Sequence, residues 1–329
     1  MRMTVYGLRR DEVELFDKYA AENGVDISVT RRFLDTETVE LAAGSEAISI
    51  VASCRLDAEL ARRLHELGVK YVLTRTAGYD HIDPDAVRRY GLRCARVPVY
   101  SRNAVSEHTV MLLLALIRDL KSELFRVDRH IFRLPGAHAR ELGSMTVGIF
   151  GTGFIGGQTA RMLSGFGCRI LAYARHPRAD LEGLVTYVTQ EELFSSSDAL
   201  IFHCSLNDST RGIVNSGTIA SMKDGVCLIN TARGELMDFS AVLAGLRSGK
   251  IAGLATDVYV NEASFMRGGS GGEIDPVLAE LISMDNVVFT HHIAFFTDTA
   301  VDNLIKITFE NFREFETTGS CRNELFRGA

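Results

Sequence analysis

The sequence has few prolines, no long apolar run and no concentration of basic charge. Five prolines in 329 residues, with 46% hydrophobic and 24% charged residues, are typical of a folded chain and exclude extended disorder. The longest apolar run, Val110 to Ile117, is much shorter than the roughly 20 residues of a membrane span. A formal charge of -6 without a basic stretch gives nucleic acid little electrostatic support. We therefore expect a globular protein that binds neither membrane nor nucleic acid.

The cysteines also lack the spacing of a metal site. Six cysteines are scattered without a Cys-x-x-Cys pair, and several lie in apolar runs, where a thiol behaves as a small hydrophobic group. We expect buried thiols and no metal site. The charged segment 1–12 lacks the apolar core of a signal peptide, so the sequence predicts a cytoplasmic protein.

Short apolar segments alternate with segments of helical periodicity along the chain. Strands are predicted in a first set at 3–8, 25–30, 47–52, 70–75 and 92–97. A second set is predicted at 145–150, 168–174, 198–204, 225–232, 251–259 and 286–292. Nearly continuous apolar strands separated by helix-length segments predict an α/β fold, in which helices cover both faces of parallel sheets.

One long helix is predicted from Ser101, acting as N-cap, to about residue 125. It is apolar on nearly all faces around its middle, which indicates either deep burial or a subunit contact. Another amphipathic helix is predicted after Phe296. A chain of 329 residues exceeds the usual size of one domain, so two domains are expected.

A glycine-rich motif follows the predicted strand at 145–150 and opens a helix. Gly151, Gly153 and Gly156 enclose Thr152, Phe154 and Ile155 in the order Gly-x-Gly-x-x-Gly. In this context the glycines allow a tight turn, close approach of a pyrophosphate and helix packing on the strand. The motif alone is weak evidence, but the strand, turn, helix and next strand together predict dinucleotide binding.

The end of the next strand bears on the choice of cofactor. A NAD-binding unit normally has Asp or Glu there to bind the ribose hydroxyls. Here the strand ends at Ala174 and continues with Arg175, His176, Pro177 and Arg178. Guanidinium groups suit a 2′-phosphate, so the sequence favours NADPH, or use of both NADPH and NADH, over strict NADH. The alternative is a solvated basic turn beside a ribose pocket that does not distinguish NADH from NADPH.

Several ionisable residues follow the later strands: Arg233, Asp257, Glu262 and His292. Strand ends are where ligands bind in open α/β sheets. Each residue also has an ordinary interpretation, as a surface arginine, a turn or cap, a loop carboxylate or a strand-end histidine, and taken singly that interpretation is favoured.

Together these residues resemble the D-isomer-specific 2-hydroxyacid dehydrogenase family over nearly the whole chain. Within that family the sequence is most similar to the D-lactate dehydrogenase branch, including the vancomycin-resistance enzyme. The motifs that carry the resemblance are TRTAGYDHID (74–83), VPVYS (97–101), VGIFGTGFIG (147–156), GFGCRILAY (165–173), MKDGVCLINTARGEL (222–236), GKIAGLATDVY (249–259) and NVVFTHHIAFFT (286–297).

The resemblance implies NAD(P)H-dependent reduction of a small, pyruvate-like 2-keto acid to its D-2-hydroxy acid. Arg233 would bind the substrate carboxylate and polarise the keto oxygen, His292 would donate the proton, and Glu262 would raise the histidine pKa. The residue before His292 is His291, where the family usually has proline, and His291 is the rival proton donor. Bulkier keto acids, such as phenylpyruvate or branched-chain acids, are alternative substrates.

The same matching implies further contacts. For the substrate these are Ala77, Gly78, Tyr100 and Phe295, with packing as the alternative for the two aromatic rings. For the cofactor they are Gly151, Gly153, Phe154, Ile155, Gly156, Arg175, His176, Arg178, His203, Cys204, Ser205, Thr231, Ala232 and Asp257. Ser205 stands where the family commonly has proline, and we expect a small effect on cofactor fit.

The resemblance implies two Rossmann-like or flavodoxin-like domains with parallel sheets and a cleft between them. A discontinuous substrate-binding domain would comprise 1–100 and 297–329, and a Rossmann dinucleotide-binding domain 101–296. The family also implies a homodimer. The alternative of a different class is a dinucleotide-sensing, corepressor-like binding protein, and formate dehydrogenase is disfavoured because Glu262 replaces a neutral amide.

Overall fold

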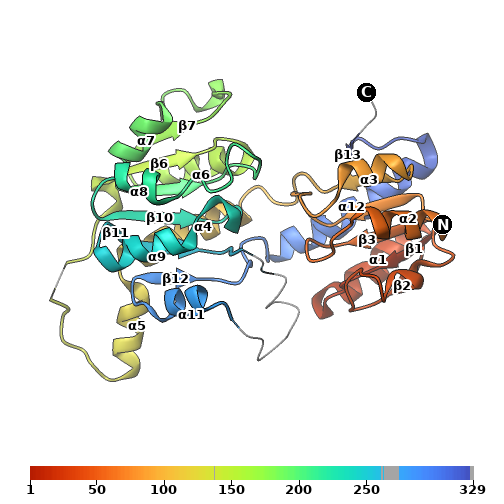
Figure 1. Ribbon diagram of the computed structural model, residues 1–329, viewed down its shortest axis with the longest axis horizontal. Coiled ribbons are helices and arrows are strands. Elements are labelled where there is room, and N and C mark those ends of the chain that lie inside the picture. Colours follow the sequence, from red (N-terminus) through yellow and green to blue (C-terminus); the bar gives the residue numbers. More distant parts are fainter. Residues whose placement is uncertain (137, 261, 263–273, 327–329) are drawn as a thin grey trace. The chain divides into compact units, whose positions relative to one another are not determined.

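The computed structural model describes residues 1–136, 138–260, 262 and 274–326. The chain divides into two compact units, of which one comprises Met1–Ser101 and Phe296–Ala329 and the other Arg102–Phe295. Each unit is an α/β structure built on its own sheet, so the predicted α/β fold with parallel sheets is confirmed (Figure 1).

The unit formed by both ends of the chain contains a six-stranded sheet in the order β13-β5-β4-β3-β1-β2. Five strands are parallel, in the flavodoxin-like order 2-1-3-4-5, and β13 pairs with β5 in antiparallel orientation. The strands are β1 (Arg2–Val5), β2 (Asp26–Val29), β3 (Ala47–Ile50), β4 (Tyr71–Thr74), β5 (Arg93–Arg96) and β13 (Glu324–Leu325). The helices are α1 (Val13–Asn23), α2 (Ala58–Glu66), α3 (Pro84–Arg89) and α12 (Asp298–Thr318), with short 3-10 turns η1 (Arg10–Glu12) and η2 (Val39–Ala42).

The second unit contains a seven-stranded parallel sheet in the order β12-β11-β10-β9-β6-β7-β8. The strands are β6 (Thr146–Phe150), β7 (Arg169–Tyr173), β8 (Thr186–Tyr187), β9 (Ala199–Phe202), β10 (Val226–Asn230), β11 (Ile251–Thr256) and β12 (Val287–Phe289). Its helices are α4 (Ala104–Ile117), α5 (Leu120–Asp128), α6 (Phe154–Ser164), α7 (Gln190–Ser196), α8 (Ser216–Ser221), α9 (Phe239–Ser248) and α11 (Pro276–Ser283), with 3-10 turns η3 (Leu142–Ser144), η4 (Ala179–Leu181) and η5 (Gly234–Leu236). The order reverses at β6, as in a Rossmann sheet.

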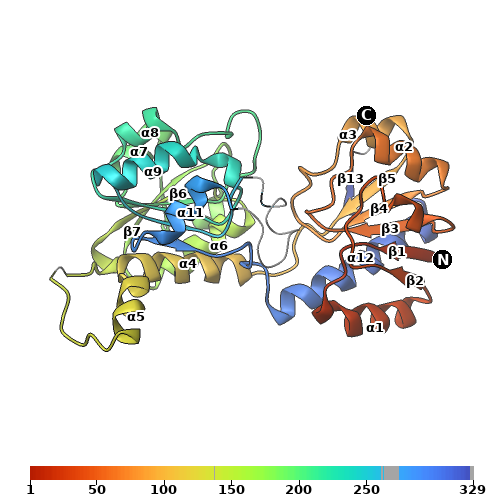
Figure 2. The ribbon, with the colours of Figure 1, turned by 60° about the horizontal axis from the view of Figure 1, so that its bottom comes forward.

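Alternation of side chains along the strands supplies a core on each face of this sheet. Val147, Ile149 and Ile201 pack with α4 and α6, whereas Leu200 and Leu228 pack on the opposite face. Figure 2 shows α7, α8 and α9 on one side of the strands and α4 and α6 on the other. Both faces are buried, which explains why these strands read as continuous apolar runs.

The predicted helix from Ser101 to 125 is wrong in two respects. The helix α4 begins at Ala104, and its N-cap residue is Asn103 rather than Ser101. The chain then breaks at Asp119, whose φ is 50°, before α5 begins. The apolar middle of α4 is buried in the second unit, including Leu112 and Leu113, so burial is the correct alternative there.

Two short strands were not predicted, β8 and the antiparallel β13. Each has two residues, too few for an alternation pattern to be visible in the sequence. The cysteines follow the prediction more closely, because five of the six are buried and Cys204 is partly buried.

Candidate active site

The expected site residues of the second unit follow the carboxyl ends of adjacent parallel strands. In this sheet β9, β10, β11 and β12 lie in line on one side of β6, and β7 lies on the other. Gly151, His203, Arg233 and Asp257 come just after β6, β9, β10 and β11, and His292 comes shortly after β12. The carboxyl ends of parallel strands meet at one edge, and ligands bind there beside the reversal of strand order.

The turn between β6 and α6 is packed so closely that it requires glycine. Gly151 has a φ of 100°, and a Cβ on it would lie 2.8 Å from the His203 carbonyl oxygen. A Cβ on Gly156 would lie 2.0 Å from the Gly151 oxygen, so α6 packs directly on the turn. At Gly153, by contrast, an added Cβ would meet no described atom within 4 Å. The backbone is therefore open to a ligand at Gly153.

The start of α6 fits the pyrophosphate of a dinucleotide. Gly153 is the N-cap residue, and having no side chain it cannot cap the first amides of this helix. Such amides and the helix dipole attract anionic oxygens. The N–H groups of Phe154 and Ile155 are the candidate donors, and Phe154 is exposed. The open approach at Gly153 and the uncapped helix together fit the group.

The loop after β7 carries the three basic residues expected to contact the cofactor. Arg175 and His176 are exposed, but Arg178 is held in place. Its Nη1 donates to the Gly153 carbonyl oxygen at 2.9 Å, and its Nε and Nη2 donate to the Asp180 carboxylate at 2.9 and 2.6 Å. This pairing lowers the pKa of Asp180. The sequence interpretation missed Asp180, although it stands only two residues after Arg178.

Neutral side chains follow β9, where cofactor contacts were also expected. The Nε2 of His203 lies 2.9 Å from the Thr159 hydroxyl, and burial lowers the pKa of this histidine to about 3. Burial raises the pKa of the Cys204 thiol to about 11, which makes it a poor nucleophile. Ser205 is exposed, and its carbonyl oxygen accepts a hydrogen bond from Thr210. These groups add no charge beside the glycine turn.

Arg233 follows β10 in a backbone fixed by neighbouring residues. Asn230 accepts a hydrogen bond from the Ala232 amide and donates to the Arg233 carbonyl oxygen. The Thr231 hydroxyl lies 2.8 Å from the Thr109 hydroxyl on α4. A Cβ on Gly234 would lie 2.1 Å from the Tyr259 carbonyl carbon, so this turn packs directly on the chain that follows β11.

His292 and Glu262 form a close pair. The His292 Nδ1 lies 2.6 Å from Glu262 Oε2, and Glu262 Oε1 accepts a hydrogen bond from the Tyr259 amide. Burial alone would lower the pKa of His292, but the bond and charge of Glu262 outweigh burial, and the pKa is raised. Asp257 adds to this effect and Arg233 opposes it. His291, the rival histidine, is exposed.

The loop that carries His292 is organised around the buried Asp257. Its Oδ1 accepts hydrogen bonds from the Ile293 amide at 2.9 Å and the Thr290 hydroxyl at 2.5 Å, and its Oδ2 accepts from the Ala294 amide at 2.9 Å. Burial would raise the pKa of Asp257, but these bonds and His108 on α4 hold it below its usual value. The sequence interpretation missed Thr290 and His108.

Comparisons with known proteins agree with this geometry. The model of the family described as "D-isomer specific 2-hydroxyacid dehydrogenase, NAD binding domain" matches residues 110–294, more than half of the chain. The chain belongs to the D-isomer-specific 2-hydroxyacid dehydrogenase family. The resemblance found in the sequence motifs is therefore confirmed.

Relatives within the D-isomer-specific 2-hydroxyacid dehydrogenase family span the full length of this chain. The "Aromatic 2-oxoacid reductase" of Clostridium sporogenes is 37% identical over 327 residues, which cover 98% of this chain and 99% of that protein. The "D-2-hydroxyacid dehydrogenase (NAD+)" of Lacticaseibacillus paracasei is 34% identical, with 99% and 98% covered. The D-lactate dehydrogenase of Aquifex aeolicus complexed with NAD and lactic acid has a TM-score of 0.90 at 28% identity, with 99% and 100% covered.

The remaining expected substrate residues of this family member lie in two places. Phe295 is in the second unit, with its ring centroid 6.3 Å from that of His292 and the planes at 80°. Ala77, Gly78 and Tyr100 are in the other unit, after β4 and β5. The Ala77 carbonyl oxygen accepts from Arg96, and the Tyr100 carbonyl oxygen accepts from Asn303.

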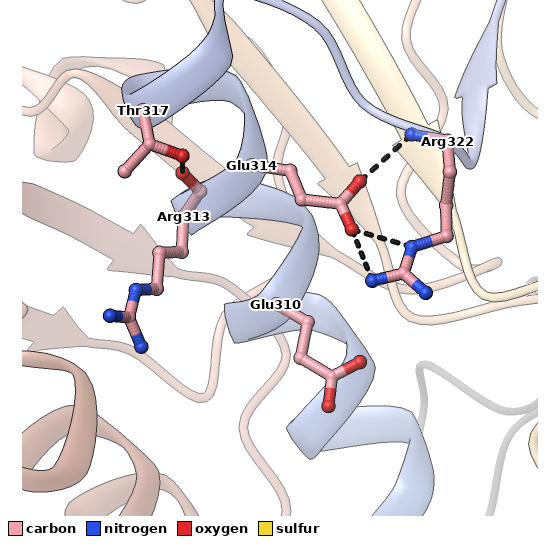
Figure 3. Close-up of a pocket in the computed structure, with 5 residues that line it drawn as sticks. All are labelled: Glu310, Arg313, Glu314, Thr317 and Arg322. Carbon is pink, nitrogen blue, oxygen red and sulfur yellow. Dashed lines mark hydrogen bonds and ion pairs between the residues drawn. The ribbon is translucent and has the colours of Figure 1, made fainter.

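Within the described ranges, no group of three His, Cys, Asp or Glu side chains could hold a metal ion, and no helix is long and apolar enough to cross a membrane. Figure 3 shows the residues that line a pocket beside α12, among which Glu314 is paired with Arg322. Its lining is Glu310, Arg313, Glu314, Thr317 and Arg322.

Proposed function

We propose that this protein uses a nicotinamide dinucleotide to reduce a small 2-keto acid to its D-2-hydroxy acid. The observation that carries the proposal is the His292–Glu262 pair, with Nδ1 and Oε2 separated by 2.6 Å. Like Arg233 and the glycine turn, both residues of the pair come after the carboxyl ends of strands in the seven-stranded sheet. An imidazole held by a carboxylate is a common general acid and base.

The residues divide the proposed chemistry among them. A bound reduced nicotinamide would supply the hydride. Arg233 would bind the substrate carboxylate through two charge-assisted hydrogen bonds and polarise the keto oxygen. His292 would donate a proton from Nε2 to that oxygen, because Nδ1 is directed to Glu262. The raised pKa of His292 extends to higher pH the range in which the imidazole carries the proton.

The proposal extends to the cofactor, for which we favour NADPH or use of both forms. In support, β7 ends at Tyr173 and is followed by Ala174 and the exposed Arg175, so no carboxylate at the strand end opposes a 2′-phosphate. The pairing of Arg178 with Asp180 weakens the contribution of that second arginine. Arg175 thus carries most of the argument.

For the substrate, pyruvate-like acids are the first candidates. The name of the Clostridium sporogenes relative, "Aromatic 2-oxoacid reductase", favours bulkier aromatic acids as a second candidate. Phe295 beside His292 suits either, and we include Ala77, Gly78 and Tyr100 as proposed substrate contacts. One methylene changes the selectivity of an enzyme by only about 1–3 kcal/mol. Kinetic measurements are therefore needed to tell which of several related keto acids is the substrate.

The test is steady-state kinetics with NADH and NADPH over pyruvate, phenylpyruvate and a branched-chain 2-oxo acid. We expect turnover with at least one acid, chiral analysis showing the D product, and a loss of about 10²-fold or more in His292→Ala. Cofactor binding without turnover of any acid would instead support the corepressor-like alternative. A loss below tenfold in His292→Ala, with activity retained, would transfer the proposed acid to His291.

We further propose a homodimer, located in the cytoplasm. Its support is the exposed apolar surface of α5 and the residues after it, since large exposed apolar side chains gathered on one element mark interaction surfaces. The exposed apolar side chains there are Leu120, Leu124, Phe125, Val127, Ile131, Phe132 and Leu134.

A further inference from the structure

His292 has a backbone conformation that its surroundings must hold. Its φ is 59°, in the left-handed region that residues other than glycine adopt only at an energetic cost. In this conformation the Nδ1 atom of the ring lies 2.6 Å from Glu262 Oε2.

The carboxylate of Asp257 supplies the contacts that hold the turn. It accepts hydrogen bonds from the successive amides of Ile293 and Ala294, and the Asp257 carbonyl oxygen accepts from the His292 amide at 2.7 Å. Asp257 is only 1% exposed. A buried carboxylate keeps its position and charge only while its oxygens are supplied with donors.

His108 reaches this cluster from a different element. It lies on α4, and its side chain is only 12% exposed. Its Nε2 is 3.0 Å from the Thr290 hydroxyl and 3.5 Å from Asp257 Oδ1, while the Thr290 hydroxyl donates to the same Oδ1. An imidazole N–H at Nε2 can therefore donate to the Thr290 hydroxyl oxygen. The Thr290 hydroxyl in turn donates its own hydrogen to Asp257.

We propose that His108 is a positioning residue, which orients Thr290 and Asp257 so that the positive-φ turn presents His292 for proton transfer. This inference rests on the proposed function of His292. His108 touches neither Glu262 nor the His292 ring in the described contacts, so it acts through the loop. Its requirement is a donor at the position of Nε2, which glutamine can supply through its amide and leucine cannot.

The experiment compares His108→Leu with His108→Gln in steady-state kinetics. We expect His108→Leu to lose about tenfold in kcat, within the range for an unsatisfied buried acceptor, with a change below twofold in KM for the keto acid. His108→Gln should recover most of that loss. The exposed His65→Leu on α2 is the matched control. Wild-type kcat in His108→Leu, or equal loss in both His108 variants, would overturn the proposal.

Two further measurements keep the test independent of folding and of the proposed function. A double-mutant cycle with Thr290→Val should be strongly non-additive, because both side chains act through one contact to Asp257, and additive losses would refute the relay. Amide hydrogen exchange at Ile293 and Ala294 should be about tenfold faster in His108→Leu, and unchanged exchange would refute the positioning role whatever the turnover. Full turnover in His292→Ala would instead refute proton transfer by His292, while hydrogen exchange at Ile293 and Ala294 would still report whether His108 holds the turn.

Discussion

The charge of Glu262 should set the pH range of the reductive reaction. Reduction needs the imidazolium form of His292, so the rate of reduction is highest at low pH and falls as the pH rises through the histidine pKa. Glu262 raises that pKa. Glu262→Gln keeps a hydrogen-bonding group but removes the charge, so the descending limb of kcat/KM should move to lower pH. Activity on the alkaline side should fall more than activity on the acid side.

The pH profile is best measured beside Glu59→Gln, an exposed change on α2 that should leave it unaltered. In the oxidative direction the ascending limb should move to lower pH as well, since the neutral imidazole then acts as base. An unmoved profile in both directions would show that Glu262 does not control His292.

Arg233 should be sensitive even to lysine. A guanidinium binds a carboxylate through two parallel bonds, whereas an ammonium offers a point charge. We expect Arg233→Lys to lose about 10²-fold in kcat/KM, with a raised KM for the keto acid and little change in cofactor KM. Arg247→Lys, an exposed change paired with Glu280, is the control. A change confined to cofactor KM would place Arg233 elsewhere in the site.

At this scale, the sequence indicated the ionisable residues but not the groups that position them. Arg233, Glu262 and His292 stand in motifs that follow predicted strands. His108 and Thr290 are 182 residues apart and meet only because α4 packs on β10, β11 and β12. No local pattern relates them, so their contact could not be predicted from one sequence.

Among the elements, the loop after β7 should separate the two cofactors. Arg175 is exposed and makes no ion pair among the described residues, so Arg175→Ala should raise KM for NADPH about tenfold or more and change KM for NADH little. Arg178 supports the Gly153 carbonyl oxygen, so Arg178→Ala should weaken both cofactors. Fluorescence titration with each nucleotide measures this difference. Equal losses for both nucleotides in Arg175→Ala would contradict the assignment.

The elements themselves were largely predictable because the central strands, such as β3, β9 and β10, are buried on both faces and read as separate apolar runs. The predicted strand at 145–150 and the observed β6 differ by one residue. The break at Asp119 was not predictable from periodicity, because apolar residues continue from α4 into α5. Their exposure on α5 depends on where that helix leaves the sheet, which is a tertiary property.

For the whole molecule, the apolar face of α5 leads to a prediction about assembly. Leu120, Leu124 and Val127 are spaced by four and three residues and are 47%, 56% and 50% exposed. This spacing puts them on one side of the helix, where a second copy could cover them. Leu124→Lys should convert a dimer into a monomer, since a buried lysine charge opposes association. Analytical ultracentrifugation of this variant, with the exposed Leu41→Lys as control, measures the outcome. A dimer that survives Leu124→Lys unchanged would show that the α5 face is not the contact.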